Sequence, residues 1–439
     1  PYTVNLTLTD DDSGTDTDSV VVTVTNLNPT LSNIAITDVD EDGTATLTGS
    51  LADIGTEDSF TLDVDWGDGS AVSTFSYAAG TTSFSETHQY LDDNPSNSAS
   101  DPYTVSLTLT DDDSGSDTDS TIVTVSNVAP ILSTDVLTQT VQYSDHITDV
   151  TITGTDVADD PLQANASWNV DGGAFVSGLP DEMSLSTNSC LFSGNERACS
   201  WTLSGIADVI AGDDIVRVTV DDDDLGQTSI DVIIEVTPED AQVRFDPDNL
   251  VAVQVDSPGS DSSSPFILQV HVQEKPETGA DAAPGNINLA EVSITLDPVG
   301  PGAPTTVQCV STGDVLENDY EAVLTVACDF SGIAVNTYVV ATTVDGGYFT
   351  GYGEDVLVIF DPSLGFTTGG GWFYWPGSED AATGSPGDRT NFGYTMSYNK
   401  KGTNVKGNLL MIRHLPDSDE IYRIKSNALF GLALGESQE

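Results

Sequence analysis

The sequence predicts an all-β protein, arranged as a linear tandem array of β-sandwiches. Val105, Leu107 and Leu109 alternate with Thr and Ser, which is the period of two expected of a half-buried strand. The stretch Pro102–Pro130 nearly repeats Pro1–Pro29, with 22 of 29 positions identical at an offset of 101 residues. Because no long helical period interrupts this pattern, we expect repeats built of strands and short turns.

The charge is extreme and uneven. The 439 residues hold 71 acidic and 11 basic side chains, giving a formal net charge of −60. No base precedes Arg197, and seven of the eleven lie from Arg389 onward. Such a field argues against nucleic acid and anionic membrane surfaces as partners. No apolar run approaches the roughly 20 residues of a membrane span, and the regular Val/Leu alternation argues against disorder.

Residues 29–129 contain one complete copy of the repeat. Its segments DVDWGDGS, THQY, YTVSLTLTDDD and VTVSNVAP together resemble the PKD domain, an Ig-like β-sandwich common in surface proteins. The resemblance matches that family's W-x-F-G-D-G core, with one residue trimmed, and its H-x-Y motif; the matching residues are Trp66, Gly67, Asp68, Gly69, His88 and Tyr90. We expect Trp66 in the core, Asp68-Gly69 in a tight hairpin turn and His88 as a hydrogen-bonded spacer rather than a ligand or base.

The remaining domains are expected on both sides of this copy. Residues 1–28 read as the C-terminal half of a PKD-like domain, completed either within a longer polypeptide or by strand addition from a neighbouring chain. Residues 130–238 are similar to an Ig/cadherin-like β-sandwich. Residues 239–365, with a Ser/Pro/Gly/Ala-rich loop at Glu277–Pro284, resemble a bacterial Ig-like domain. Residues 366–439, opening with FTTGGGWFYWPG, resemble a distinct C-terminal β-domain of large secreted bacterial proteins, and we expect this domain to be incomplete.

The four cysteines form two local pairs. Cys190 and Cys199 close a short loop, and Cys309 and Cys328 lie in two strand-like segments. No pair of C-x-x-C motifs is present, which argues against zinc. We therefore predict two disulfides and an oxidising, extracellular location at the cell surface.

Carboxylate-rich turns are the main chemical feature. DDDSGSDTD places five aspartates in nine residues, and a DDDD turn occupies the corresponding place in the next domain. Calcium takes six to eight oxygens, which clustered aspartates can supply. An EF-hand is excluded because its twelfth position would be Gly49. The predicted calcium ligands are Asp10, Asp11, Asp12, Asp16, Asp18, Asp38, Asp40, Asp42, Asp53, Glu57, Asp58, Asp111, Asp112, Asp113, Asp117, Asp119, Asp221, Asp222, Asp223 and Asp224. The alternative is that these carboxylates are solvated surface charges of the kind found on salt-adapted proteins. Such charges would spread over the outward faces of the strands, whereas here those faces carry Thr and Ser and the aspartates are concentrated in turns.

Two other functions, carbohydrate binding and catalysis, have less support in the sequence. The run Trp372–Trp375 permits carbohydrate binding, but in a strand its rings would point to opposite faces, which favours a core on one side and an interface on the other. The four histidines are scattered, and no nucleophile elbow or phosphate loop occurs, so we predict no enzyme and no catalytic residues.

The sequence as a whole favours an extracellular structural protein, either a surface stalk, an adhesin or a filament subunit, with joints stiffened by calcium. Its expected partners are other copies of itself, other surface proteins and glycans. The alternative is a non-catalytic accessory region of a secreted hydrolase or protease.

Overall fold

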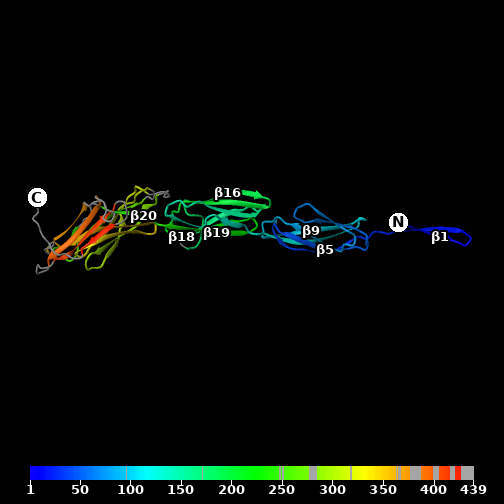
Figure 1. Ribbon diagram of the computed structural model, residues 1–439, viewed down its shortest axis with the longest axis horizontal. Helices are drawn as coiled ribbons and strands as arrows, with labels where there is room; N and C mark the ends of the chain where they lie inside the picture. The colour runs from blue at the N-terminus through cyan, green and yellow to red at the C-terminus, as the bar shows by residue number, and fades with distance from the viewer. Residues whose placement is uncertain are drawn as a thin grey trace.

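The structure is a computed structural model whose sandwiches follow one another along a single long axis (Figure 1). It describes residues 1–94, 96–170, 172–246, 249, 252–275, 284–316, 319–361, 363, 367–375, 387–398, 405–415 and 421–426. Within these residues the regular elements are β-strands and one short 3₁₀-helix. The prediction of an all-β tandem array is therefore confirmed. Most of the predicted loop at Glu277–Pro284 and the last residues of the chain lie outside the described residues.

The chain opens with a two-stranded hairpin that projects beyond the first complete sandwich (Figure 1). Its strands are β1 (Tyr2–Thr9) and β2 (Thr15–Val22), and every residue of both is exposed. We call this pair the N-terminal hairpin. Leu8 is 75% exposed, whereas its repeat equivalent Leu109 is fully buried. The hairpin thus has the sequence of a sandwich edge without the apolar cover that its copy receives.

Sandwich 1 follows, and its two sheets enclose one core. One sheet has the order β4-β10-β9-β6-β7, and the other has the order β3-β5-β8. The alternation seen in the sequence puts Trp66 (1% exposed), Leu107 and Leu109 between the sheets. The strands are β3 (Thr30–Ile36), β4 (Val39–Asp40), β5 (Thr44–Ala52), β6 (Phe60–Asp65), β7 (Ser73–Tyr77), β8 (Ser83–Gln89), β9 (Ser100–Asp111) and β10 (Ser116–Ser126).

The motif residues of sandwich 1 hold its core together, as the sequence predicts. Gly67 and Gly69 both have positive φ, which the turn after β6 requires. The His88 ring stacks on Trp66 at 4.6 Å and its Nε2 lies 2.7 Å from Asp68 Oδ2. The Tyr90 hydroxyl donates to the Trp66 carbonyl at 3.0 Å. His88 is thus a hydrogen-bonded spacer between the turn and the core.

Sandwich 2 also consists of two sheets. Their orders are β11-β13-β17-β16 and β12-β19-β18-β14-β15. The strands are β11 (Ile131–Thr134), β12 (Thr138–Gln142), β13 (Val150–Val157), β14 (Gln163–Asn169), β15 (Val176–Ser177), β16 (Met183–Ser193), β17 (Glu196–Gly205), β18 (Gly212–Asp221) and β19 (Gln227–Thr237).

Sandwich 3 is a single sheet folded over on itself. The order β24-β23-β27-β28-β20-β22-β26-β25, with β21 beside β28, contributes side chains from both halves to one core. Its elements are β20 (Glu239–Phe245), β21 (Ala252–Gln254), β22 (Phe266–Glu274), the 3₁₀-helix η1 (Ile287–Leu289), β23 (Glu291–Pro298), β24 (Thr305–Gln308), β25 (Val310–Ser311), β26 (Leu324–Phe330), β27 (Asn336–Asp345) and β28 (Phe349–Phe360).

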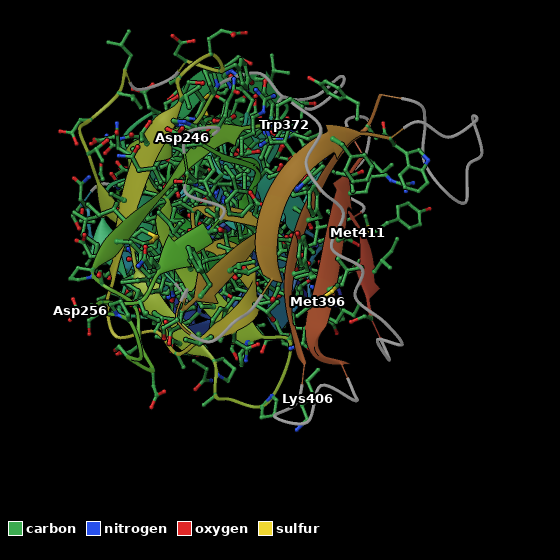
Figure 2. The ribbon with its side chains drawn as sticks, turned by 90° about the vertical axis from the view of Figure 1, so that its left-hand side faces the viewer. Asp246, Asp256, Trp372, Met396, Lys406 and Met411 are labelled. Carbon is green, nitrogen blue, oxygen red and sulfur yellow. A yellow bond between two sulfur atoms is a disulfide. The ribbon has the colours of Figure 1, made fainter. Side chains whose placement is uncertain are left out.

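A four-stranded C-terminal sheet packs beside sandwich 3 rather than beyond it (Figure 2). Leu410 and Ile412 form a small core with Val339 and Val356 of sandwich 3. Gly393 allows this approach, because a Cβ there would lie 2.5 Å from Val356. The strands, in sheet order, are β29 (Thr367–Tyr374), β30 (Arg389–Tyr398), β31 (Val405–His414) and β32 (Ile421–Lys425).

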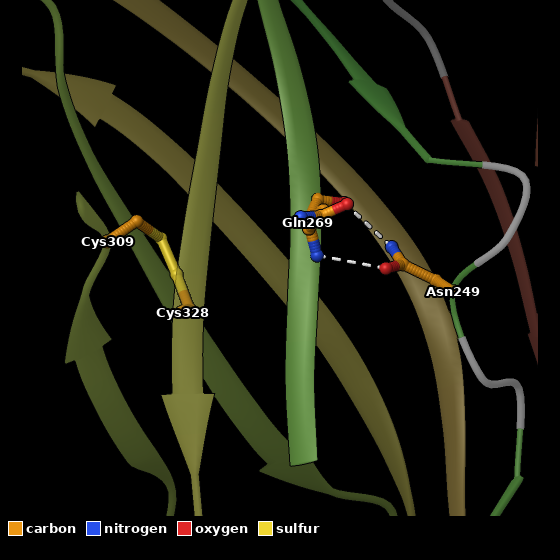
Figure 3. Close-up of a disulfide and its surroundings, with 4 residues drawn as sticks. All are labelled: Asn249, Gln269, Cys309 and Cys328. Atoms are coloured by element: carbon orange, nitrogen blue, oxygen red, sulfur yellow. Dashed lines mark hydrogen bonds between the residues drawn. A yellow bond between two sulfur atoms is a disulfide. The ribbon is translucent and has the colours of Figure 1, made fainter. Parts of the chain in front are cut away.

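Both predicted disulfides are present. Cys190 and Cys199 are directly opposed on β16 and β17, and Cys309 bonds to Cys328 of β26 (Figure 3). On the other side of β22, the Asn249 side chain pairs with the backbone of Gln269 through two hydrogen bonds of 2.7 and 2.9 Å (Figure 3). A single amide therefore satisfies backbone groups that a neighbouring strand would otherwise bond.

Candidate cation sites at the joints between sandwiches

The carboxylate turns share one local geometry. The carboxylate of Asp111 accepts the backbone N–H groups of Asp113 and Gly115 at 3.0 and 2.7 Å, and Asp10 and Asp222 do the same in their own turns. A Cβ on Gly115 would lie 2.5 Å from Asp111 Oδ2. The pattern D-x-x-x-G is therefore required by a turn folded around its first carboxylate.

Each of two linkers places an asparagine on the next turn. Asn26 Nδ2 donates to Asp111 Oδ2 at 2.8 Å, and Asn127 Nδ2 donates to Asp222 Oδ2 at 3.1 Å. The two asparagines are 101 residues apart and equivalent in the repeat. We call the contact between the N-terminal hairpin and sandwich 1 joint 1, and that between sandwiches 1 and 2 joint 2. The turns thus lie at joints, where a domain meets the linker that precedes it.

At joint 1, three of the predicted ligands come together. Asp53, Asp58 and Asp111 each offer an oxygen, and these oxygens lie within 4.8 Å of one another. Burial, together with the charges of Asp53, Asp112 and Asp111, raises the pKa of Asp58. Three carboxylates so close repel one another unless a cation lies between them.

Joint 2 gathers twice as many carboxylates. It has three overlapping groups, and in each group the carboxylate oxygens lie within 4.8 Å of one another. Together the groups contain Glu41, Asp92, Asp93, Asp156, Asp160 and Asp224. The first three belong to sandwich 1 and the others to sandwich 2, so the cluster spans the joint. We call these six residues the joint-2 cluster.

Because the carboxylates of the joint-2 cluster are buried, ionising them costs free energy. Asp93 is fully buried, and Asp160 and Asp224 are 1% and 2% exposed. Burial is the largest cause that raises the pKa of Glu41 to about 8, of Asp93 to about 7 and of Asp160 to about 9, and neighbouring carboxylates add to it. The pKa values of Asp156 and Asp224 rise to about 7 and about 6 for the same main reason.

Several of these buried oxygens have no hydrogen-bond partner. They are both carboxylate oxygens of Asp93, together with Glu41 Oε2, Asp156 Oδ2, Asp160 Oδ2 and Asp224 Oδ1. A buried polar atom without a partner costs about 1–3 kcal/mol, and more if it is charged. An all-oxygen cluster of this kind has the ligand chemistry that a hard divalent cation prefers.

Further hydrogen bonds cross joint 2. Asn97 donates to Asp223 at 3.1 Å, and Asn195 donates to Asp42 at 2.8 Å. The linker residue Val128 donates its N–H to Glu41 Oε1 at 2.8 Å. Two of the predicted ligands, Asp42 and Asp223, therefore lie at the joint but bind amides there.

The other predicted ligands are dispersed. Asp38, Asp112, Asp117 and Asp119 accept backbone N–H groups of Thr124, Ser59, Leu31 and Ser120, and Asp221 binds two side-chain amides. Asp10, Asp11, Asp12, Asp16 and Asp18 lie on the exposed N-terminal hairpin, and Asp40, Glu57 and Asp113 are exposed on sandwich 1. Among the described residues, none of these belongs to a close carboxylate group.

Five members of the joint-2 cluster were missed from the sequence. Glu41 lies between the predicted ligands Asp40 and Asp42, but it is Glu41 whose side chain is buried (5% exposed). The segments YLDDNP and TDVADDP contain the other four. Asp92, Asp93 and Asp160 follow the ends of β8 and β13, whereas Asp156 is the last residue but one of β13. A carboxylate pair just outside a strand, on the side that faces the next domain, was the available signal.

A third joint, between sandwiches 2 and 3, has a different chemistry. Tyr143 (1% exposed) packs against Tyr348 and Phe349 with ring centroids 5.0 and 5.6 Å apart. The backbone of Gly347 accepts the N–H of Ala211 at 2.9 Å. Sandwiches 2 and 3 share one continuous hydrophobic core, so joint 3 is an apolar interface.

The aromatic run of the C-terminal sheet divides between two faces, as predicted. Trp372 and Tyr374 are 51% and 63% exposed, and their ring centroids lie 5.3 Å apart. Phe373 packs on Phe392. The guanidinium of Arg413 stacks 3.5 Å from the ring of Trp375. The exposed surface is thus a pair of rings rather than a four-ring platform.

Comparison with known proteins gives likenesses only among solved structures. No family model and no curated protein matches the sequence. The chain is similar to a tetra-tandem repeat in the extending region of a large adhesion protein, with 15% identity, a TM-score of 0.32 and coverage of 90% of this chain and 91% of that one. It is also similar to the D1–D4 ectodomain fragment of ICAM-5, with 9% identity, a TM-score of 0.30 and coverage of 92% and 99%. Neither likeness bears on what this chain binds.

Proposed function

We propose that this chain is the rod of an extracellular structural protein, a surface stalk, adhesin or filament subunit, in which calcium stiffens the joints between β-sandwiches. On this proposal sandwich 1 and the N-terminal hairpin are PKD-like, the later sandwiches are Ig-like, and the chain is not an enzyme. The observation that carries the proposal is the joint-2 cluster, whose carboxylates come from two domains and include six buried oxygens without a hydrogen-bond partner.

The arrangement of the chain supports a mechanical role. The sandwiches lie end to end (Figure 1), so the length of the molecule depends on the angle at each joint. A cation bound by both domains fixes that angle, since bending would separate its ligands. The two disulfides support an oxidising location. Among the described residues no helix is long and apolar enough to cross a membrane.

Removal of calcium tests the proposal. Because a ligand that binds only the folded, aligned state stabilises it by RT ln(1 + [L]/Kd), calcium at 100 times its Kd contributes about 2.7 kcal/mol. We expect a chelator at physiological salt to lower the melting temperature and to shorten the maximum dimension seen by small-angle scattering. Restoring calcium should reverse both changes, and sodium at equal ionic strength should not. If neither quantity responds, the carboxylates are solvated charge and the proposal is wrong.

A further inference from the structure

Joint 2 contains three overlapping carboxylate groups rather than one. The groups are Glu41, Asp92 and Asp93; then Glu41, Asp156 and Asp160; then Asp92, Asp160 and Asp224. Glu41, Asp92 and Asp160 each belong to two groups, and we call them the shared residues. Asp93, Asp156 and Asp224 each belong to one, and we call them the private residues. We propose that joint 2 binds at least two divalent cations, with the shared residues as bridging ligands.

The charge of the cluster is too large for one ion. Six carboxylates carry a formal charge of −6 when ionised, and one divalent cation would leave four negative charges without compensation. The positive charge of Arg197 acts on Asp156 but provides only one unit. Buried charges without partners are expensive, and Asp93, Asp160 and Asp224 are at most 2% exposed. Two divalent cations leave two negative charges without compensation. Arg197 compensates one of these, and bound water can hydrogen-bond the remaining carboxylate.

The unpartnered oxygens are distributed over all three groups. Asp93 of the first group has two such oxygens, and Asp156 of the second and Asp224 of the third have one each. The shared residues Glu41 and Asp160 also have one each. An ion in any single group would leave at least one buried oxygen of the private residue of each other group without a hydrogen-bond partner. The distribution of missing partners, which is independent of how many acids are present, therefore indicates several ion positions.

Joint 1 provides a comparison within the same chain. It has one group, of Asp53, Asp58 and Asp111. Both oxygens of Asp111 accept hydrogen bonds, as do both oxygens of Asp92 at joint 2, which Asn94 donates to. A single group of three carboxylates fits one ion. Since a carboxylate has two oxygens and can bind a different ion with each, the shared residues of joint 2 couple its ions, and binding there should be cooperative.

The inference rests on the proposed function, but its test is separate. The number of bound calcium ions is measured on the intact chain by native mass spectrometry and by titration calorimetry at one fixed pH. We expect Asp93→Asn and Asp224→Asn each to lose one ion and the double variant to lose two. Asp160→Asn removes a ligand from the second and third groups, so it should lose the ion of each of these groups that is occupied and should abolish cooperativity. Asp119→Asn is the control, because that carboxylate accepts the Ser120 N–H outside the clusters and its loss should remove no ion.

The outcomes separate the two claims. If Asp93→Asn, Asp224→Asn and the double variant all lose the same single ion, joint 2 is a one-ion site and the inference is overturned, while the proposed function stands. If none of the variants loses an ion, both are overturned. Folding is checked by the melting temperature in chelator, which we expect each variant of the joint-2 cluster to raise because it removes a buried negative charge. A variant that melts lower both with and without calcium would show that the cluster is held by hydrogen bonds rather than ions, which also contradicts the inference.

Discussion

A buried aspartate and a half-buried histidine lie where the C-terminal sheet meets sandwich 3, and their pKa values move in opposite directions. Burial raises the pKa of Asp355 to about 6, although hydrogen bonds from Val356 and Asn391 oppose the change. Burial, with the charge of Arg389, lowers the pKa of His414 to about 4. Asn391 lies between them, donating to Asp355 and lying 3.4 Å from His414 Nε2.

These shifts predict a pH dependence that cancels in the native chain. Asp355 stabilises docking below its ordinary pKa of 3.8 and loses that contribution as pH rises through about 6. His414 stabilises docking above 6.5 and loses that contribution as pH falls towards 4. One proton changes stability by at most about 1.4 kcal/mol per pH unit. Between pH 4 and 6 we expect docking to become weaker with rising pH in His414→Phe and stronger in Asp355→Asn.

Hydrogen exchange of β30 and β31, corrected for intrinsic rates, measures this docking. The native chain should show little change over the same range. Two variants with slopes of the same sign would contradict the assignment of the opposing contributions to Asp355 and His414.

At the scale of the elements, the strands and turns could be predicted and their contacts across joints could not. Alternation placed Leu107 and Leu109 inward, and the stretch DDDSGSDTD marked a turn between β9 and β10. The predicted turn was too long, because β10 begins within this stretch, at Ser116. Whether a carboxylate binds a backbone N–H or faces a neighbouring domain depends on its position within the turn. Asp111 does both through its two oxygens, whereas Asp119, eight residues later, only caps Ser120. Asp111 and Asp119 lie in similar local sequence, so the sequence alone could not distinguish their roles.

The turn geometry predicts a large effect of one methyl group. In Gly115→Ala the new Cβ would lie 2.5 Å from Asp111 Oδ2, so the carboxylate must move and lose its bonds to Asn26 and Gly115. We expect a loss of about 1–2 kcal/mol, measured as faster hydrogen exchange in β9 and β10. Gly313→Ala is the matched control, since nothing lies within 4 Å of its Cβ and its φ is not positive. Equal behaviour of the two variants would show that the Asp111 carboxylate does not organise the turn.

At the scale of the whole molecule, the sequence contained the repeat but not the differences between joints. The near-identity of Pro1–Pro29 and Pro102–Pro130 predicts equivalent linkers, and Asn26 and Asn127 do make equivalent contacts. The third joint could not be anticipated, because Tyr143 lies in a polar stretch and Phe349 at the start of a strand more than 200 residues later. Long-range packing of this kind leaves no local pattern. As a result, two joints carry carboxylates and one carries aromatic rings.

This difference predicts that calcium acts on only part of the rod. Joint 3 is held by Tyr143, Tyr348 and Phe349 in a core continuous with both sandwiches, and apolar contacts of this kind do not depend on cations. In chelator we therefore expect joint 2 to bend while sandwiches 2 and 3 keep their relative orientation. Distances between pairs of fluorescent labels, one pair across each joint, would show this. In Tyr143→Ala, which removes the central ring, the pair across joint 3 should change at every calcium concentration, whereas the pair across joint 2 should still respond to calcium as in the native chain. A joint 3 that opens on chelation in the native chain would contradict the distinction, and it would mean that one mechanism controls the shape of the whole rod.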